Sequence, residues 1–455
     1  MLSLSNMVKT ESTSQMKVTP ILPAPLHIGI LGTGPAVPMT ALALEKYLSP
    51  GRARVTLLDR NESEIDFPGV EYGIQARAGR ALERIGQLEQ AYARGNPSRE
   101  LAFYNARLAK RFNSVAFDPK YTRCVVRQEF LADPAGLLRH SPVQRRHLVA
   151  AISAGEDHRM TAKGTVHGAP FSETFDLLLA CDGVNSVMRK ALFPDQAVIH
   201  DRGFSCIYML VEGTAETAPA GFLGHANSGC CELVMGHFCT MTMFPLGHGP
   251  LALGIGFDHA SKAMIWKSHG LSPDAEWKDP PAATKKSIAV TLTRDADIDD
   301  GMLVKALDLV PDWDSYKIYL WAMRDTDPLD TPWSAQVNVV LISDAAHAIM
   351  PTIGMGASLA IEDAEALAAL IAAAANDAKT PTAFRAAAKG AIFVPFTAAR
   401  HLVWVNLINR ARRAAIGNFI NGWRRKRFAI GLQIPNTTLS RVVTGVEWVA
   451  DKLGV

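Results

Sequence analysis

The chain has 455 residues, 48% of them hydrophobic and 20% charged, and a formal net charge of +3. Chains above about 250 to 300 residues usually exceed one hydrophobic core, so we expect at least two domains. None of the six cysteines forms a Cys-x-x-Cys pair, which argues against structural zinc, predicts no metal site and favours a reducing, cytoplasmic location.

Residues 1–26 combine Ser, Thr, Lys and Pro without a continuous apolar stretch. This composition is typical of a disordered tail and unlike that of a secretory signal. We therefore expect the folded part of the chain to begin at residue 27.

A strand, a glycine turn and a helix come next. The apolar stretch 26–31 predicts a strand, Gly32 and Gly34 predict a tight turn, and the residues after them have helical spacing. A second apolar strand ends at Asp59. Free amides at such a helix start favour a pyrophosphate, and an acid at this point accepts hydrogen bonds from a ribose diol. The order predicts a dinucleotide-binding βαβ unit.

This turn departs from the usual Gly-x-Gly-x-x-Gly pattern. Val37 replaces the third glycine, which normally lets helix and strand pack closely, and Pro35 and Pro38 flank the turn. Proline is tolerated in a first helical turn, so we still expect the helix. An ordinary tight turn without a ligand is the alternative interpretation.

Two further segments precede residue 200. Residues 142–152 look like the start of a helix, in which the spacing to Leu148 favours Arg145 as the candidate residue and leaves Arg146 as the close alternative. Another apolar strand ends at Asp182 and Gly183, before a short helix that contains Arg189. If this strand lies parallel to the first two, its carboxyl end reaches the edge where open α/β sheets bind ligands. A surface arginine and a simple strand-to-helix turn are the alternatives.

The middle of the chain has a different pattern. Short alternating runs between residues 204 and 320, separated by glycine and proline, predict antiparallel strands. Met235, His237, Phe244 and Pro245 lie in this stretch and are candidates to line an apolar substrate pocket. An ordinary core position is the alternative for each of them.

The segment 337–364 carries the clearest signal. An apolar strand ends just before Asp344, and Gly354 and Gly356 open an alanine-rich helix whose first amides are free. Such a helix start stabilises negative charge nearby. The segment therefore predicts a site for a large anionic cofactor.

Three polar residues beside this helix are expected to have structural roles. We expect His347 to be a hydrogen-bonded packing residue. Glu362 and Asp363 are expected to cap or pair on the surface of the helix.

The charge is unevenly distributed. Residues 378–446 contain no Asp or Glu and carry +12, and residues 447–455 carry −1, which leaves −8 on residues 1–377. Basic helices with aromatic residues can lie on an anionic membrane surface, pack on the acidic body or mediate homodimerisation. Nothing beyond the basic cluster supports nucleic-acid binding, and no apolar run of about 20 residues predicts a spanning helix.

Together, the three strand-and-glycine segments resemble the flavin-binding signature of single-component FAD-dependent monooxygenases of the para-hydroxybenzoate hydroxylase type. The resemblance implies an α/β fold, with a Rossmann-like FAD-binding domain interleaved with an antiparallel β-sheet substrate domain and followed by C-terminal helices. The expected boundaries are a tail at 1–26, FAD-binding parts at 27–200 (with substrate-side insertions around 75–140) and 326–385, a substrate domain at 201–325, and basic C-terminal helices at 386–455.

The resemblance also implies FAD as cofactor and NAD(P)H as electron donor. In the family pattern, the Asp182–Gly183 pair serves both cofactors, Arg145 lies near the flavin, and Asp344 accepts from the ribityl chain, although Ser343 replaces the family glycine here. The implied cofactor-binding residues are Gly32, Gly34, Asp59, Arg145, Asp182, Gly183, Asp344, Pro351, Gly354, Met355 and Gly356.

The expected activity is oxygen transfer from O₂ to a small, largely apolar organic substrate, by hydroxylation or epoxidation, with secondary metabolism favoured over aromatic catabolism. No catalytic side chain is assigned, because the flavin performs the chemistry. One alternative is an FAD-binding reductase or oxidase without oxygen transfer. Another is a redox-inactive scaffold of the same fold, because Pro35, Val37 and Ser343 all depart from the pattern.

Overall fold

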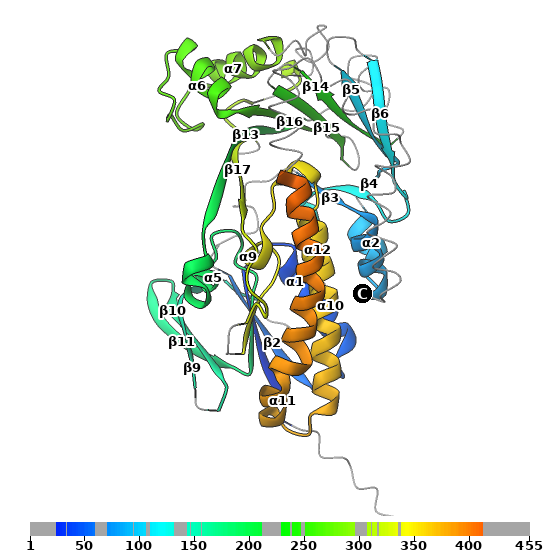
Figure 1. Ribbon diagram of the computed structural model, residues 1–455, viewed down its shortest axis with the longest axis vertical. Helices are drawn as coiled ribbons and strands as arrows, with labels where there is room; N and C mark the ends of the chain where they lie inside the picture. Colours follow the sequence, from blue (N-terminus) through cyan, green and yellow to red (C-terminus); the bar gives the residue numbers. More distant parts are fainter. Residues whose placement is uncertain are drawn as a thin grey trace, which may run out of the picture.

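The structure is a computed structural model. It describes residues 24–32, 34–59, 71–93, 95–105, 110–131, 143–145, 147–155, 157–211, 229–236, 239–246, 251–295, 307–310, 312–315, 318–334 and 338–412. A parallel sheet with its helices lies at one end of the molecule, and a large, mostly antiparallel sheet lies at the other (Figure 1).

The parallel sheet contains the predicted βαβ unit. Its strand order is β18-β12-β1-β2-β8, and every neighbouring pair is parallel. Its central strands are apolar and fully buried, as expected for a sheet covered on both faces. The strands are β1 Leu26–Leu31, β2 Ala53–Asp59, β8 Val143–Arg145, β12 Leu177–Ala180 and β18 Val339–Leu341.

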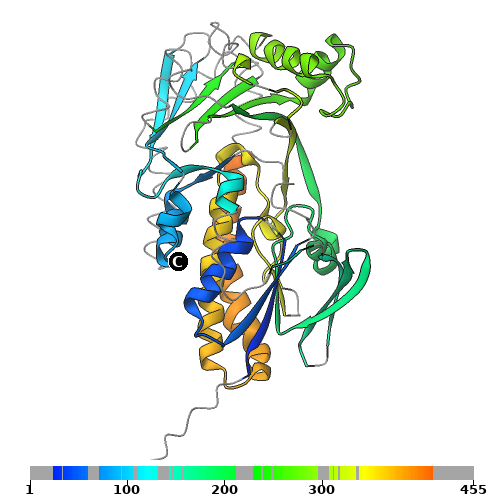
Figure 2. The same cartoon turned by 180° about the vertical axis from the view of Figure 1, so that it is seen from behind.

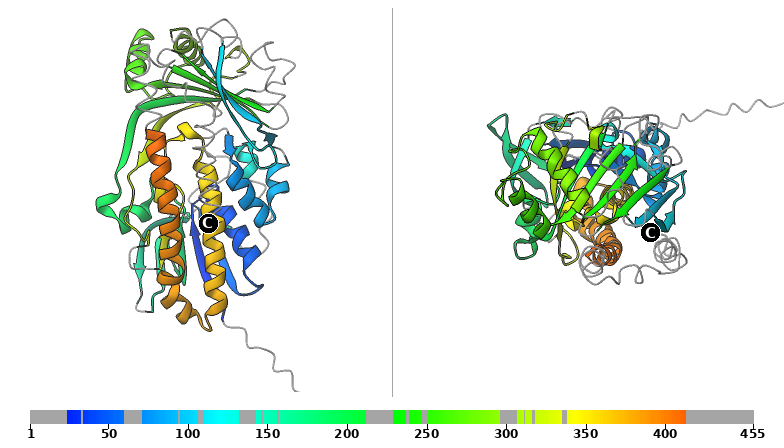
Figure 3. Two further views of the ribbon diagram at one scale, coloured as in Figure 1. Left: turned by 45° about the vertical axis from the view of Figure 1, so that its right-hand side comes forward. Right: turned by 90° about the horizontal axis from the view of Figure 1, so that it is seen from above.

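Helices α1 (Ala36–Tyr47) and α10 (Gly356–Asp377) pack side by side against this sheet (Figure 2). Alanine and leucine dominate both helices, so their buried faces are apolar and their axes can lie close together. After α11 (Pro381–Ala388) and a π-helical turn (Lys389–Phe393), α12 (Val394–Arg412) runs alongside α10 (Figure 3).

The large sheet has seven strands in the order β17-β13-β16-β15-β14-β5-β6, and α6 (His259–Ser268) and α7 (Ala282–Asp295) cover its outer face (Figure 1). All its neighbouring strands are antiparallel except the β14–β5 pair. The strands are β5 Glu100–Asn105, β6 Lys110–Ala116, β13 Ile199–Val211, β14 Cys230–Met235, β15 Cys239–Pro245, β16 Leu251–Asp258 and β17 Ile318–Thr326.

Two small sheets complete the architecture. One joins β3 (Glu71–Ile74), β7 (Arg123–Val126) and β4 (Asn96–Pro97), and the other joins β9 (His147–Ala154), β10 (Met160–Val166) and β11 (Ala169–Phe175). The remaining described elements are α2 Ala76–Arg84, α3 Leu88–Tyr92, α5 Val187–Leu192, α9 Asp344–His347 and the 3₁₀ turns Pro194–Gln196 and Pro351–Ile353.

The α/β fold class and the C-terminal helices are confirmed. The helix predicted at residues 142–152 is wrong, because this segment forms β8 and β9. Parallel pairing of β8 with the distant strand β2, and antiparallel pairing of β9 with the next strand β10, override a local pattern that fits a helix equally well. The domain boundaries stay predictions, and residues 1–23 and 413–455 of the two tails lie outside the described part of the chain.

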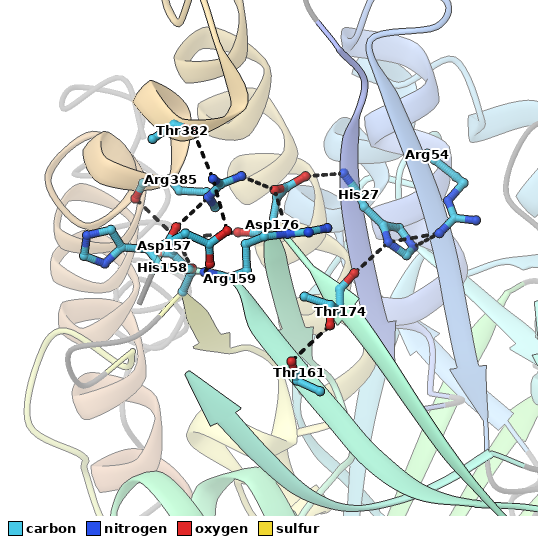
Figure 4. A network of polar contacts seen from close by, with 11 residues as sticks. His27, Arg54, Asp157, His158, Arg159, Thr161, Thr174, Asp176, Thr382 and Arg385 are labelled. Atoms are coloured by element: carbon cyan, nitrogen blue, oxygen red, sulfur yellow. Dashed lines mark hydrogen bonds and ion pairs between the residues drawn. The ribbon is translucent and has the colours of Figure 1, made fainter. Parts of the chain in front are cut away.

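A polar network ties the amino ends of the central strands together (Figure 4). Asp176, just before β12, accepts hydrogen bonds from the backbone amide of His27 at 2.7 Å and from Nη1 of Arg385 at 2.5 Å. The His27 ring contacts the Thr56 hydroxyl at 3.1 Å, and the Arg385 guanidinium also donates to the carbonyl of Asp157 at 2.8 Å. The network joins β1, β2, β12 and α11.

Candidate functional site

The carboxyl ends of β1, β12 and β18 meet at one edge of the sheet. The registers place Leu31 beside Ala180 and Ala180 beside Leu341, so Gly32, Asp182 and Asp344 follow three adjacent strand ends. Gly32 has a φ of +116°, and a Cβ at this position would lie 2.2 Å from the carbonyl oxygen of Cys181. Only glycine fits such a close approach of two backbones. The convergence expected from the sequence is therefore present.

The turn before α1 leaves open space. No protein heavy atom among the described residues lies within 4 Å of where a Cβ on Gly34 would be. Val37, which replaces the third glycine of the usual pattern, is buried and packs in the main core, and its amide donates to the carbonyl of Gly34 at 3.1 Å. Asp59 is buried at the end of β2, beside the ends of the other strands.

Asp182 organises the start of α5. Its Oδ2 accepts from the amides of Val187 at 2.8 Å and Met188 at 3.3 Å. Its Oδ1 is buried and has no hydrogen-bond partner among the described residues. One carboxylate oxygen therefore fixes the local fold, and the other is available to a ligand.

Arg189 holds two parts of the site together. Its guanidinium is buried and donates to the carbonyls of Ala346 at 2.7 Å, Asp327 at 2.8 Å and Gln196 at 3.0 Å. Burial lowers the pKa of Arg189 to about 10. The arginine of the Asp-Gly motif thus connects α5 to the turn that carries Asp344.

The turn at Ser343 and Asp344 has an unusual backbone. Ser343, at the position of the family glycine, has φ +56° and ψ −143°, a region that strongly favours glycine. Asp344 is half-buried at the start of α9. Burial raises the pKa of Asp344, although the nearby charges of His347 and Arg127 act in the opposite direction.

Arg127 is a site residue that the sequence reasoning missed. It begins a helical turn at residues 127–131, directly after β7, and its guanidinium carbon lies 5.6 Å from the centre of the Tyr72 ring. Its charge acts on both Tyr72 and Asp344. The sequence signal that could have identified Arg127 is an arginine between an apolar strand and a helix. Arg145 instead lies on β8, where its backbone pairs with Asp59, and its role stays a prediction.

A buried ionic network supports the Asp344 turn from behind. Asp363 accepts from the amide of Ser343 at 2.9 Å, from Nε2 of His347 at 2.5 Å and from Nε of Arg400 at 2.5 Å. Arg400 also donates to Glu362 at 2.9 Å. Burial alone would raise the pKa of Asp363, but the charges of His347 and Arg400 lower it to about 2.

This network corrects one expectation and agrees with another. Glu362 and Asp363 were placed on the helix surface, but both are buried, because α12 brings Arg400 against this side of α10. His347 is a buried, hydrogen-bonded residue, as expected.

The start of α10 completes the edge. Gly354 has φ +62°, and no described heavy atom lies within 4 Å of a Cβ placed on Gly354 or Gly356. Met355 between them is half-buried and packs against the core. The hydroxyl of Ser358 accepts from the amide of Gln75 at 3.0 Å and donates to the carbonyl of Gly73 at 3.2 Å, which fixes β3 against α10.

Two more polar groups lie in this region. The Thr352 hydroxyl, next to the half-buried Pro351, is buried without a hydrogen-bond partner among the described residues. Burial raises the pKa of Glu71, at the start of β3, to about 7, even though its own backbone amide donates to the carboxylate.

These features fit FAD. A ligand with many oxygens and a pyrophosphate would use the free amides at the starts of α1 and α10, together with Asp182 Oδ1 and the Thr352 hydroxyl. No group of three or more His, Cys, Asp or Glu side chains within the described ranges is arranged to hold a metal ion.

The seven-stranded sheet approaches the site at Pro351. Met350, just before this proline, packs with Phe204 and Cys206 of β13 and Met323 of β17. Of the predicted substrate residues, Phe244 is half-buried against the cluster that contains Cys124, Cys231, Leu246 and Ala252, and Pro245 is buried on β15. His237 and the side chain of Met235 lie outside the described part of the structure.

Comparisons with known proteins agree with this geometry. The family model of an FAD binding domain matches residues 312–387. Kynurenine 3-monooxygenase from Salinispora arenicola is 24% identical over 376 residues, covering 80% of this chain and 76% of that protein. 2-Heptyl-3-hydroxy-4(1H)-quinolone synthase from Pseudomonas aeruginosa is 26% identical over 322 residues, covering 69% and 74%. The structure of HpxO from Klebsiella pneumoniae complexed with FAD and uric acid has a TM-score of 0.70 at 17% identity, covering 92% of this chain and 97% of that one.

The fold and the site define a flavoprotein of the FAD-binding α/β class. Residues 312–387 match an FAD binding domain, and the chain is similar to FAD-dependent monooxygenases of the aromatic hydroxylase family. Its cofactor is FAD, and NAD(P)H is the usual electron donor in the family. The relatives support oxygen transfer and do not support the reductase, oxidase or scaffold alternatives.

Proposed function

We propose that this monooxygenase hydroxylates or epoxidises a small, largely apolar aromatic molecule of secondary metabolism, which binds between the flavin and the seven-stranded sheet. The proposal is carried by one observation: Gly32, Asp182 and Asp344 meet at a single sheet edge, which β13 and β17 approach from the other side. Nucleic acid is not among the expected partners.

The chain's own residues would hold and orient the cofactor. Amides at the start of α1 would bind the pyrophosphate, and Asp344 would accept from the ribityl chain beside the positive charge of Arg127. Amides at the start of α10, after Gly354, would stabilise negative charge on the ring. FAD, when bound, supplies the oxygen chemistry, and the protein positions the substrate and excludes water.

The substrate class follows from the chemistry of the facing side chains. Phe204, Met323 and Met350 form a buried apolar cluster at the meeting point, and Phe244 lies on β15 of the same sheet, which β16 separates from β13. Aromatic rings and thioether groups favour a flat apolar partner. The names of the relatives point the same way, since kynurenine and a heptyl quinolone are both aromatic.

Product analysis tests the proposal. The purified full-length protein should be yellow, and it should convert a member of an aromatic metabolite panel into a product that carries one ¹⁸O atom from ¹⁸O₂, with NAD(P)H consumed in equal amount. NAD(P)H consumption that yields peroxide with every compound in the panel, and no oxygenated product, would contradict it.

A second proposal concerns the C-terminal helices, which have two candidate roles: homodimerisation and peripheral membrane contact. Val394 and Leu402 of α12 are apolar and exposed, at 46% and 66%. No helix in the described part of the chain has the length and apolar character that crossing a membrane requires. Sedimentation and flotation with anionic vesicles, for the full chain and for a chain ending at residue 412, separate homodimerisation from peripheral membrane contact.

A further inference from the structure

Two buried thiols meet where the small β3-β7-β4 sheet packs on the seven-stranded sheet. The Sγ atoms of Cys124 on β7 and Cys231 on β14 are 3.6 Å apart, and both residues are buried. The hydroxyl of Ser98 lies 3.3 Å from the Cys124 sulfur and 3.8 Å from the Cys231 sulfur. These residues come from three separate segments of the chain, so tertiary packing alone brings the sulfurs together.

The two thiols are chemically unequal. The hydrogen bond from Cys231 lowers the pKa of Cys124, with the Ser98 hydroxyl acting in the same direction, and the same interaction raises the pKa of Cys231. The directions of the two shifts make Cys124 the better attacking sulfur of the pair, although burial of Cys124 acts against its ionisation. This is the division of roles found in a pair of attacking and resolving cysteines.

The pair also has a link to the cofactor side. β7 pairs with β3, and the carbonyl of Gly73 on β3 accepts the Ser358 hydroxyl at the start of α10. On the other side, the same apolar cluster as the two thiols contains Phe244 of β15. A bond between the two sulfurs would thus connect the cofactor side to the substrate side.

We propose that Cys124 and Cys231 form an oxidation-sensitive pair, which hydrogen peroxide closes into a disulfide that ties the β3-β7-β4 sheet to the seven-stranded sheet. This rests on the proposed function in one respect: a flavin monooxygenase that consumes NAD(P)H and O₂ without substrate releases hydrogen peroxide. The oxidant therefore arises when substrate is absent.

The chemistry balances in two steps. The Cys124 thiolate attacks one peroxide oxygen, the O–O bond breaks, and hydroxide leaves, so Cys124 becomes a sulfenic acid. The Cys231 thiol then attacks the Cys124 sulfur, and the sulfenic hydroxyl leaves with the thiol proton as water. In total, two thiols and one peroxide give one disulfide and two waters. The sulfur atoms must approach from 3.6 Å to the disulfide bond length of about 2 Å.

The other cysteines provide a matched control. Cys239 is as buried as the pair and lies on the same large sheet, and burial alone raises the pKa of its thiol. Cys239→Ala should therefore leave the response to peroxide unchanged. Cys124→Ala and Cys231→Ala should each abolish it.

Mass spectrometry of the FAD-loaded full-length protein tests the proposal without requiring turnover. After peroxide treatment and alkylation of free thiols, digestion with trypsin and Glu-C should yield peptide 124–127 linked to peptide 217–232, and fragmentation should place the bond on Cys231 and not on Cys230. Reducing agent should release the two peptides. Absence of the linked pair in the wild-type protein would overturn the proposal, whether or not the protein oxygenates any substrate.

A second experiment tests the source of the oxidant. NAD(P)H and O₂ without substrate should produce the same linked peptides, and catalase should prevent them. The oxidised enzyme should turn over roughly tenfold more slowly, since ångström-scale misplacement of groups at an active site has effects of this size or larger, and reductant should restore the rate. Linkage that catalase does not prevent, or linkage only with added peroxide, would overturn the self-generated oxidant.

Discussion

The two ends of the parallel sheet differ in whether their polar groups are paired within the protein. At the amino ends of the strands, Asp176 is held by His27 and Arg385 within a paired network. At the carboxyl ends, Ser343 has a glycine-like backbone, burial raises the pKa of Asp344, and an oxygen of Asp182 has no partner among the described residues. The first end stabilises the fold, and the second holds polar groups ready for a ligand.

The largest expected effect comes from the network behind the Asp344 turn, which is paired although it lies at the ligand end. Arg400→Met should reduce the free energy of unfolding by about 3 kcal/mol, because it removes the buried cation that Asp363 and Glu362 share and leaves them only His347 and Arg77 as partners. Urea unfolding followed by circular dichroism measures this. Arg84→Met is the control, since the half-exposed Arg84–Glu365 pair should contribute at most about 1 kcal/mol. Equal effects of the two substitutions would contradict the assignment.

Substituting one aspartate at each end of the parallel sheet, Asp176 at the amino ends and Asp344 at the carboxyl ends, tests this difference between the two ends. Asp176→Ala should reduce the stability of the apoprotein by about 3 kcal/mol, because it leaves the buried Arg385 guanidinium with only the exposed carboxylate of Asp157 at 3.6 Å, and should leave the FAD affinity of the folded protein unchanged. Asp344→Ala should do the reverse, with nearly unchanged apoprotein stability and an FAD affinity lower by about tenfold or more, or roughly 1.4 kcal/mol. Unfolding curves measure the effect on stability, and flavin fluorescence titrations measure the effect on FAD affinity. Loss of FAD affinity in Asp176→Ala, or a large loss of stability in Asp344→Ala, would contradict the prediction.

The raised pKa of Glu71, at the carboxyl-end side of the sheet, predicts that the stability of the protein depends on pH. Its pKa is about 7 in the folded protein, against 4.5 as the ordinary value, so the folded state binds more protons than the unfolded state between these limits. Stability should therefore fall as the pH rises from about 4.5 to 7, by roughly 2 to 3 kcal/mol. Glu71→Gln should flatten this dependence when unfolding is measured at pH 5 and pH 8. The exposed residue Glu89 provides the control Glu89→Gln, which should leave the wild-type slope intact.

The smallest effect concerns the backbone of Ser343. Ser343→Gly should raise the stability of the apoprotein by about 1 kcal/mol, because glycine adopts a φ of +56° without a Cβ clash, and should preserve FAD binding. Ser172→Gly on strand β11 should instead lower stability by about 0.5 to 1 kcal/mol. Thermal unfolding of both variants decides the point, and destabilisation by Ser343→Gly would show that the serine side chain contributes more than its backbone costs.

Much of the site could be predicted because its signals are local. Each of the strands ending before Gly32, Asp182 and Asp344 is a short apolar run that stops at glycine or an acid. Parallel pairing then brings their carboxyl ends together, so the convergence follows from sequence order and sheet geometry.

The residues that were missed depend on distant partners. Arg127 is placed beside Tyr72 and Asp344 only by the packing of β7 on β3, and no local pattern distinguishes it from Arg145. Asp363 was expected on a helix surface because its cation, Arg400, lies 37 residues further along the chain. The conformation of Ser343 likewise became visible only in three dimensions.

The long strands β13 and β17 bear on how the substrate half of such enzymes could be exchanged between relatives by recombination. Ile199 and Thr326 are paired neighbours, so the chain leaves and re-enters the cofactor half of the molecule at one place (Figure 1). A chimera made at these two junctions is nevertheless incomplete, because β14 pairs with β5 from residues 100–105. Recombination between relatives must transfer both segments together, or it leaves an open strand edge of the kind that aggregates.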